Sequence, residues 1–362
     1  MGTSLMRSAV PRTDVALRPA ALAMVWLGPG HPHETIAVPG VALADAEVLV
    51  AVEMSTICDS DVDTVLGLRS APTPLVLGHE SVGRVIATGH VGASAVDGTP
   101  LRIGDRVVWS ATVSCANCER CLRGTPQHCR SVAEYGHERI GAHGDLTGAF
   151  GSHVQLREGT AIVRVPESLP AVVLAPASGA TATAWAALAR ARRDRDVEGA
   201  AVRIYGAGLV GLSAAAIATE FGASVEVFDP DPSRRELASR YGAGSSGRVP
   251  DVVIEASGRA VAEAIDAVDL GGTVLLTGRL PCPEPVALDA DSIVRRMITV
   301  SGVRDYSGID LAEAVAFLAG RGRAYPFAEA VGDVRPLEEI DDALRAASAP
   351  DAPLRIGLIP GR

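Results

Sequence analysis

The sequence predicts an α/β protein of two domains, one a compact β-barrel-like domain and the other built on a doubly wound parallel sheet. Three observations lead to this prediction. The chain has 362 residues, enough for about two domains. Up to residue 150 it consists of short strand-like runs separated by glycine, proline and aspartate. Beyond Pro166, apolar strands alternate with helical segments.

Composition excludes several classes of partner and chemistry. The formal net charge of −10 argues against a nucleic acid or an anionic membrane. The chain contains no lysine, which excludes a lysine general base or Schiff base. The first 27 residues are interrupted by arginine and proline, so we predict that they form neither a signal peptide nor a membrane helix. We therefore expect a cytoplasmic protein.

The barrel-like domain begins with strands expected near residues 46–52, 83–87 and 105–109. A cysteine-rich lobe follows at about residues 110–135, with the ligand candidates Cys115, Cys118, Cys121 and Cys129. Four thiolates at this spacing can close a tetrahedral shell without a water position, which predicts a structural zinc. The alternative is a pair of disulfides, which an intracellular chain disfavours. We assign Cys282 no role.

Residues 58–80 contain the candidate catalytic centre. Cys58, His79 and Glu80 offer a thiolate, an imidazole and a carboxylate, which are ligand types that suit Zn²⁺. Asp61 is a candidate partner for the imidazole, and the Ser60 hydroxyl can exchange a proton with a substrate oxygen. The alternative is that Cys58 is a small buried hydrophobe and His79 a core histidine. The complete set favours the metal site.

The second domain opens with a helix expected at residues 174–191 and a strand at residues 201–205. A glycine-rich turn leads from that strand into a helix at residues 212–221. The turn contains Gly206, Gly208, Leu209, Val210 and Gly211. A GxGxxG pattern alone is weak, but this one lies between a strand and a helix, which predicts a dinucleotide site.

The carboxylate that ends the next strand bears on the choice of cofactor. Asp229 can accept hydrogen bonds from both ribose hydroxyls, which favours NAD(H) over NADP(H). Arg234 and Arg235 follow closely and can stack on adenine or accommodate a 2′-phosphate, so NADP(H) stays open. Further strands are expected at residues 251–258, 271–278 and 297–303, and a last strand at 353–359 is expected to pack back on the first domain.

With these motifs in this order, the chain resembles the zinc-containing medium-chain alcohol dehydrogenases over nearly its whole length. The resemblance implies a GroES-like catalytic domain at residues 1–170 and 322–362, split around a Rossmann domain at residues 171–321. It also implies hydride transfer at a nicotinamide and a homodimer or homotetramer. Segments 135–138 and 175–183 are most similar to the phosphonate-associated branch and to the cyclitol reductases of antibiotic pathways.

Three departures from the family pattern affect what the resemblance implies. The position that usually supplies a third zinc ligand is Gly179, so the catalytic zinc depends on Cys58, His79 and Glu80 with a water, binds weakly, or is lost. Only eight residues separate Gly242 from Asp251, too few for a strand and a helix. We therefore expect a Rossmann sheet trimmed by one strand–helix unit. Asp63 replaces a histidine of the proton relay.

Three hypotheses for the function follow. The first is a zinc-dependent oxidoreductase acting on a small polyhydroxylated, cyclitol-like ketone or alcohol in secondary metabolism. The second is reduction of the conjugated C=C of a cyclic enone, which a weakened zinc shell favours. The third is a nucleotide-binding protein without activity.

Overall fold

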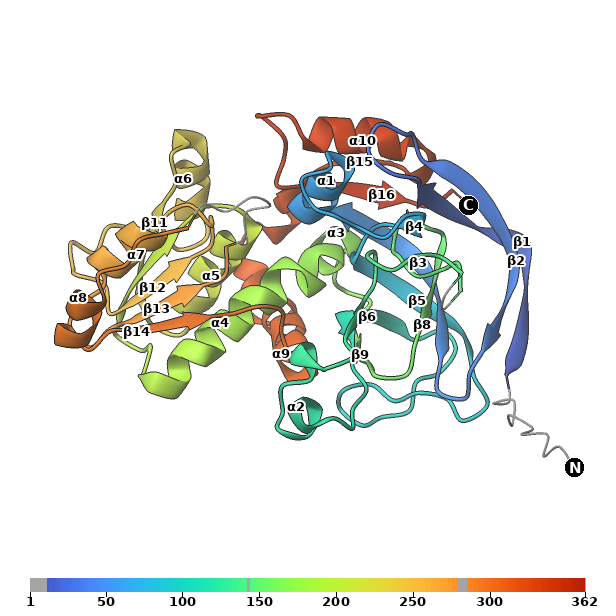
Figure 1. The fold of residues 1–362 in the computed structure, drawn as a ribbon, viewed down its shortest axis with the longest axis horizontal. Helices are drawn as coiled ribbons and strands as arrows, with labels where there is room; N and C mark the ends of the chain where they lie inside the picture. The colour runs from blue at the N-terminus through green and yellow to red at the C-terminus, as the bar shows by residue number, and fades with distance from the viewer. Residues whose placement is uncertain (1–11, 142–143, 279–284, 362) are drawn as a thin grey trace, which may run out of the picture.

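The computed structural model describes residues 12–141, 144–278 and 285–361, and Cys282 lies outside them. The chain folds into a β-rich part and a parallel-sheet part, with long helices between them (Figure 1). We call these the barrel part and the parallel-sheet part. This arrangement confirms the predicted α/β architecture.

Two sheets make up the barrel part. A three-stranded sheet has the order β2-β1-β4, formed by Glu34–Leu43, Thr13–Trp26 and Leu75–Val76. An eight-stranded sheet has the order β15-β16-β3-β5-β6-β7, with β8 on β3 and β9 on β6. Its strands are Val331–Pro336, Arg355–Ile359, Val48–Ile57, Glu80–Thr88, Arg106–Val113, Ala133–Glu134, His153–Leu156 and Thr160–Arg164.

The C-terminal strand completes the barrel part. β16 runs antiparallel to β3, with Ile356 opposite Ile57, so the chain end packs back on the first strands as predicted. The core is aliphatic apart from large residues such as Trp26 and Trp109, each 1% exposed. Burying one such ring contributes about 4–6 kcal/mol of transfer free energy. The site strands β3, β5 and β16 are therefore held in a rigid frame.

Five parallel strands in the order β11-β10-β12-β13-β14 form the other sheet. They are Ser224–Phe228, Ala201–Tyr205, Val252–Glu255, Thr273–Leu276 and Thr299–Gly302. The order is that of a six-stranded doubly wound sheet without its third strand. No helix or strand lies between α6 (Pro232–Ser239) and β12, which confirms the predicted trimming.

The helix that enters the parallel-sheet part is broken where one continuous helix was predicted. α3 (Ala171–Leu174) passes into a 3₁₀ turn, Ala175–Ser178, and then bends by 54° into α4 (Ala180–Asp194). Pro176 lacks an N–H donor and ends the first turn. The break places Gly179 at the head of α4, beside strand β5.

Alanine-rich helices pack closely against the parallel sheet. α5 (Leu209–Glu220) and α9 (Gly308–Ala319) lie against α4, and the helices share buried alanines such as Ala184 and Ala215. The remaining α-helices are α1 Asp59–Val65, α2 Glu119–Leu122, α7 Val261–Ala267, α8 Ala290–Arg295 and α10 Ile340–Ala347.

Within the described residues, no single helix has the length and apolarity needed to span a membrane. The bent pair α3–α4 passes such a test by length and composition alone.

Candidate metal and cofactor sites

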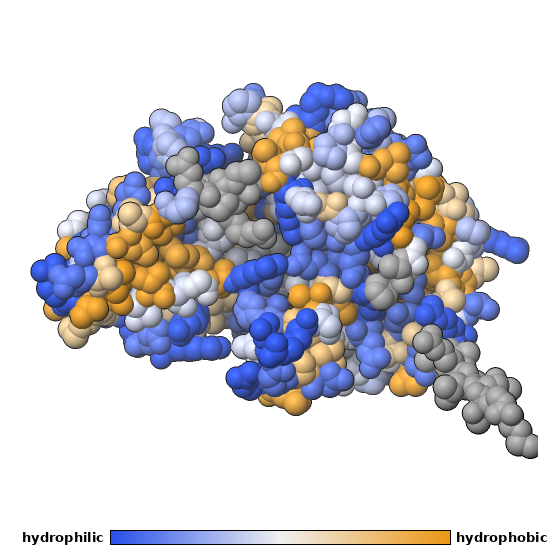
Figure 2. Space-filling model, viewed as in Figure 1, coloured by the Kyte–Doolittle hydropathy of each residue, from blue (hydrophilic) through white to orange (hydrophobic). Residues whose placement is uncertain are grey.

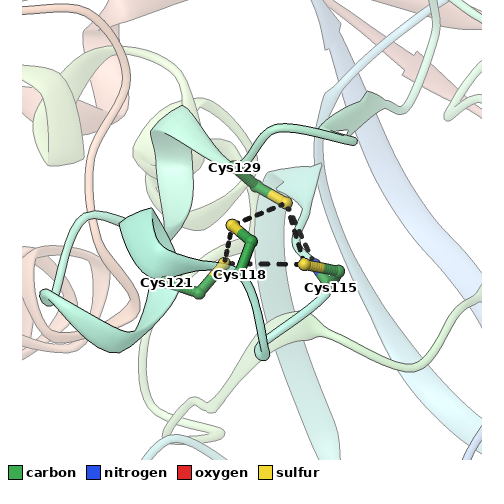
Figure 3. A group of neighbouring side chains, drawn as sticks. All are labelled: Cys115, Cys118, Cys121 and Cys129. Atoms are coloured by element: carbon green, nitrogen blue, oxygen red, sulfur yellow. Dashed lines mark hydrogen bonds between the residues drawn. The ribbon is translucent and has the colours of Figure 1, made fainter.

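The four lobe cysteines point toward one another (Figure 3). Their sulfurs are separated by 3.4 Å (Cys115–Cys129), 3.5 Å (Cys118–Cys121), 3.9 Å (Cys118–Cys129) and 4.0 Å (Cys115–Cys121). Sulfurs around a tetrahedral zinc at about 2.3 Å lie about 3.8 Å apart, so the group fits this ion. All four thiols are free, which rules out the disulfide alternative in this structure.

Electrostatics within the lobe favour a bound cation. Backbone N–H groups of Arg130 and Cys121 lower the pKa of Cys118 to about 6. Burial and the neighbouring thiols raise the pKa of Cys121 to about 12. Four sulfurs this close cannot all be ionised without a compensating charge, which Zn²⁺ supplies.

Cys58, His79 and Glu80 form the second cluster, and their donor atoms all lie within 4.8 Å of one another. Cys58 follows the end of β3 and caps α1, where its backbone N–H donates to Asp61. His79 and Glu80 come at the start of β5, which pairs with β3. Adjacent antiparallel strands therefore bring together residues that are 21 positions apart or more.

Glu80 is fully buried and is held by side chains of the barrel part. Arg355 of β16 donates from Nε and Nη2 over 2.8 and 3.0 Å, and the Thr56 hydroxyl donates over 2.7 Å. Arg355 Nη2 also lies 3.7 Å from the Cys58 sulfur. The bidentate pair of Arg355 with Glu80 neutralises the buried carboxylate and fixes its orientation.

Gly179 explains where the Glu80 carboxylate lies. A Cβ placed on Gly179 would sit 1.9 Å from Glu80 Oε1. The carboxylate thus fills the space that a side chain at position 179 would need. A soft sulfur, an imidazole nitrogen and this carboxylate oxygen are a donor set that fits zinc, with room for a fourth ligand in the adjoining cavity.

Asp61 is the partner of His79, as expected from the sequence. Its Oδ1 lies 3.7 Å from His79 Nδ1, and it is itself buried. Burial opposes charge on the imidazole, but Asp61 and the Cys58 sulfur raise the pKa of His79 well above its ordinary value. The pair orients the ring so that Nε2 is the nitrogen available to a metal.

The glycine-rich turn joins β10 to α5 in the predicted way. Gly206 has φ +101°, and a Cβ on Gly211 would lie 1.9 Å from the carbonyl oxygen of Gly206, so both positions need glycine. Gly208 is the N-cap residue of α5, and Leu209, the first residue of this helix, is buried. The first turn of this helix presents backbone N–H groups, which are the donors that bind phosphate groups at helix N-termini in general.

Asp229 lies directly after β11, beside this turn. Its Oδ2 accepts from the Ala207 backbone N–H over 2.7 Å, and Oδ1 accepts from the N–H of Asp231 over 3.0 Å. Arg234 lies 4.0 Å from Asp231, whereas Arg235 donates to the carbonyl of Asp229. Both carboxylate oxygens therefore accept backbone N–H groups, and among the described residues no ion pair joins this carboxylate to Arg234 or Arg235.

One cavity of about 630 Å³ connects the metal cluster with the cofactor turn. Cys58, Ser60 and His79 line one side, and Val210 of α5 lines the other. Residues at or just after the ends of β12, β13 and β14 complete that side: Ala256, Leu276, Thr277, Gly278, Gly302 and Val303. The structure thus brings the predicted catalytic residues and the predicted cofactor turn to one cleft.

Sequence reasoning missed Arg355, and also Arg69, Glu134 and Arg304, which line the same cavity. Arg355 lies 275 positions from Glu80, so no local motif connects them. The one available signal was a charged residue opening an otherwise apolar strand, because a buried charge requires a partner.

Comparisons with known proteins agree with this geometry. Residues 44–167 match the family model "Alcohol dehydrogenase GroES-like domain", and residues 178–306 match "Alanine dehydrogenase/PNT, C-terminal domain". An L-threonine 3-dehydrogenase of Anaeromyxobacter dehalogenans is 31% identical over 306 residues, covering 77% of this chain and 80% of the relative. The chain belongs to the zinc-type alcohol dehydrogenase family.

Two further relatives extend this similarity over nearly the whole of the present chain. A sorbitol dehydrogenase of Bacillus subtilis is 29% identical, covering 91% of this chain and 94% of the relative. The structure of an alcohol dehydrogenase from Thermotoga maritima superposes with a TM-score of 0.86 at 27% identity, covering 94% and 99% of the two chains. The chain is thus an NAD(P)-dependent medium-chain dehydrogenase/reductase with a four-cysteine structural zinc site.

Proposed function

We propose that this enzyme transfers a hydride between a nicotinamide cofactor and a small polyhydroxylated cyclic ketone or alcohol, at a catalytic zinc held by Cys58, His79 and Glu80. The observation that carries the proposal is the single cavity that metal cluster and cofactor turn share. Its opposite walls would hold the two partners that hydride transfer requires.

The chemistry of the cavity wall supports a substrate rich in hydroxyl groups. On the barrel side the wall is formed largely by polar and charged side chains: Asp59, Ser60, Asp63, Arg69, Thr112, Glu134 and His137. A hydrocarbon chain would displace water from these groups and form no hydrogen bond with them in return. A polyol can satisfy them, and the names of the relatives, sorbitol and L-threonine 3-dehydrogenases, describe polar substrates.

In this proposal each residue has a defined task. When bound, zinc supplies Lewis-acid polarisation of the substrate oxygen, and a bound nicotinamide supplies or accepts the hydride. Cys58 and His79 face the cavity and place the metal there. Glu80 completes the ligand set while Arg355 prevents its movement. The hydroxyl of Ser60 exchanges the proton of the substrate oxygen with solvent.

Reduction of a conjugated C=C is the second candidate. It is favoured by the contacts of Glu80, whose two oxygens already bind Arg355 and Thr56. A metal must share this carboxylate with Arg355, which weakens the binding of the metal and with it the polarising effect available to the substrate. Hydride addition to a cyclic enone needs less of that effect, because a hydroxyl group can stabilise the enolate.

Metal analysis and a substrate screen test the proposal. Purified protein should contain two zinc ions per chain, and Cys58→Ala should lose one of them and nearly all ketone reduction. Cys118→Ser is the matched control, since it should lose the other ion and keep the chemistry. Cyclic polyhydroxylated ketones and enones are then assayed with NADH and NADPH separately. Full activity in Cys58→Ala, or reduction of the enones only, would refute the ketone mechanism.

We also propose that the enzyme forms a homodimer through β14. This strand is the edge of the parallel sheet, and its backbone hydrogen-bonding groups are open to another strand on one side. Apolar residues gather over this end of the molecule (Figure 2), and Val294, Met297 and Val300 are exposed. Light scattering should give twice the chain mass for the wild type, and a monomer for Val300→Pro. A monomeric wild type would refute the dimer.

A further inference from the structure

Three charged side chains meet at the rim of the catalytic cavity. Glu134 of β7 lies between Arg69, which follows α1, and Arg304, which follows β14. Its Oε2 is 3.2 Å from Arg69 Nη2, and its Oε1 is 2.7 Å from Arg304 Nη2. Each carboxylate oxygen therefore binds one guanidinium, and the pair of arginines comes from opposite walls of the cleft.

These side chains separate two cavities. Arg69, Glu134 and Arg304 line the cavity of about 630 Å³ that contains the metal cluster, and they also line a neighbouring cavity of about 510 Å³. Cys58 and His79 line only the first. The three charged groups thus lie where the two cavities adjoin, which gives a place for the part of a substrate that does not react.

The charges at this rim balance, which determines what it can recognise. The two arginines face Glu134 and also Asp305, whose Oδ2 accepts from Arg304 Nε over 3.2 Å. Two guanidiniums against two carboxylates give no net charge to attract an anion or a cation. They do offer strong donors and strong acceptors side by side, which suits neutral groups that both donate and accept.

We propose that Arg69, Glu134 and Arg304 form a subsite that binds two adjacent hydroxyl groups of the substrate, remote from the reacting carbon. One hydroxyl donates a hydrogen bond to the Glu134 carboxylate. Both hydroxyl oxygens accept hydrogen bonds from the guanidinium groups of Arg69 and Arg304. No ion pair has to break, because a carboxylate accepts several hydrogen bonds and a guanidinium donates five. The inference rests on the proposed function and adds the residues that determine specificity for a diol.

The backbone around the subsite holds it in a fixed arrangement. Glu134 pairs with Thr112 of β6 in the sheet and lies at the C-terminal end of the four-cysteine lobe. Asp305, beside Arg304, has φ +58°, an uncommon conformation for a residue other than glycine. The next residue, Tyr306, accepts from the backbone N–H of Ala111 over 3.2 Å and so ties this segment to the barrel part. Little conformational entropy is lost when a diol binds to groups arranged in advance.

The experiment compares a polyol with a matched alcohol that lacks the diol. Zinc-loaded full-length protein, as wild type, Glu134→Gln or Arg304→Gln, is assayed for kcat/KM with myo-inositol and with cyclohexanol. Arg240→Gln is the control, because Arg240 forms an exposed pair with Glu329 elsewhere on the surface. We expect the myo-inositol value to fall about 10- to 100-fold in the two subsite variants. The cyclohexanol value, and both values in the control, should change less than about twofold.

Calorimetric binding of myo-inositol in the presence of NADH separates this inference from the proposed function. Weaker binding of myo-inositol in Glu134→Gln than in wild type supports the subsite, whether or not any alcohol is oxidised. Absence of alcohol oxidation would refute the proposed function but not the subsite. Equal losses for both alcohols would overturn the subsite and reduce the three side chains to a bridge between the two parts. Binding of inorganic phosphate to the wild type in competition with myo-inositol would also overturn it, in favour of an anion site.

Discussion

The four lobe cysteines come from one stretch of chain, Cys115 to Cys129, whereas the cluster of Cys58, His79 and Glu80 also involves Arg355, 297 positions from Cys58. In the lobe the sulfurs contact mainly one another, and the surrounding loop is largely exposed. In the cluster each of the three groups has a protein partner: Asp61 for His79, and Arg355 for both Glu80 and the Cys58 sulfur.

This difference separates two ways to build a metal site. The lobe contains four thiols that repel one another once they are ionised. Only a cation can balance this repulsion, so the order of the lobe depends on the metal. The cluster is arranged by strand pairing and buried hydrogen bonds, so it keeps its shape without an ion. The predictions below test this contrast, beginning with the largest expected effect.

Breaking the Glu80–Arg355 pair should have the largest effect. Glu80→Gln leaves the Arg355 guanidinium buried without its counter-charge, which should cost about 3–5 kcal/mol of unfolding free energy. The double variant Glu80→Gln/Arg355→Met should recover most of this stability and still lack the catalytic metal. Urea unfolding and zinc analysis measure the two quantities. An equally unstable double variant would show that the pair is not what orders the cluster.

Removing the lobe metal should have a smaller and more local effect. Cys118→Ser should lose one zinc and lower Tm by about 1–3 °C, equivalent to about 1–2 kcal/mol for a chain of 362 residues. Hydrogen exchange should increase in residues 111–135 while β3 and β5 stay protected. Increased exchange in β3 and β5 as well would contradict the independence of the two sites.

The glycine-rich turn resembles the cluster because protein hydrogen bonds hold it in place before any cofactor binds. Asp229 provides one of them, as the acceptor for the Ala207 N–H. Asp229→Ala removes both the acceptor for a ribose and the hydrogen bond from Ala207. We expect the preference for NADH over NADPH, as a ratio of kcat/KM values, to fall about tenfold, equivalent to about 1.4 kcal/mol. Asp231→Ala is the control, since that side chain caps α6. An unchanged ratio would refute the ribose contact.

Acid should affect the surroundings of the cluster through one buried histidine. His33 Nδ1 is 2.7 Å from Asp341, and burial lowers its pKa below 6.5. The unfolded chain therefore takes up a proton at a higher pH than the folded one, so stability falls as pH drops below 6.5. Urea unfolding at pH 7.5 and 5.5 should show a smaller acid loss in His33→Gln than in wild type. Parallel pH profiles would exclude His33 as the source.

Local motifs made most of the architecture predictable. The lobe spacing, the strand–turn–helix around Gly206 and the short segment before Asp251 each report structure formed by neighbouring residues. The sequence also showed that Gly179 lacks a ligand. It could not show that Glu80 fills the resulting space, because that depends on how α4 packs against β5.

What the sequence could not supply was the set of partners contributed by distant segments. Arg355 reaches Glu80 only after β16 pairs with β3, and Arg304 reaches Glu134 only after the two parts meet. Such contacts follow from strand order and domain packing, which no single stretch of residues encodes. The helix break at Pro176 was readable from the proline itself, yet the alanine-rich composition concealed it.

Because the space at position 179 is already taken, positions 80 and 179 cannot be altered independently. A cysteine introduced at 179 to strengthen the metal site would strike the carboxylate and push it against Arg355. An engineer seeking a tighter zinc enzyme must therefore shorten residue 80 in the same step, and the single exchange alone should give a poorer catalyst than the parent.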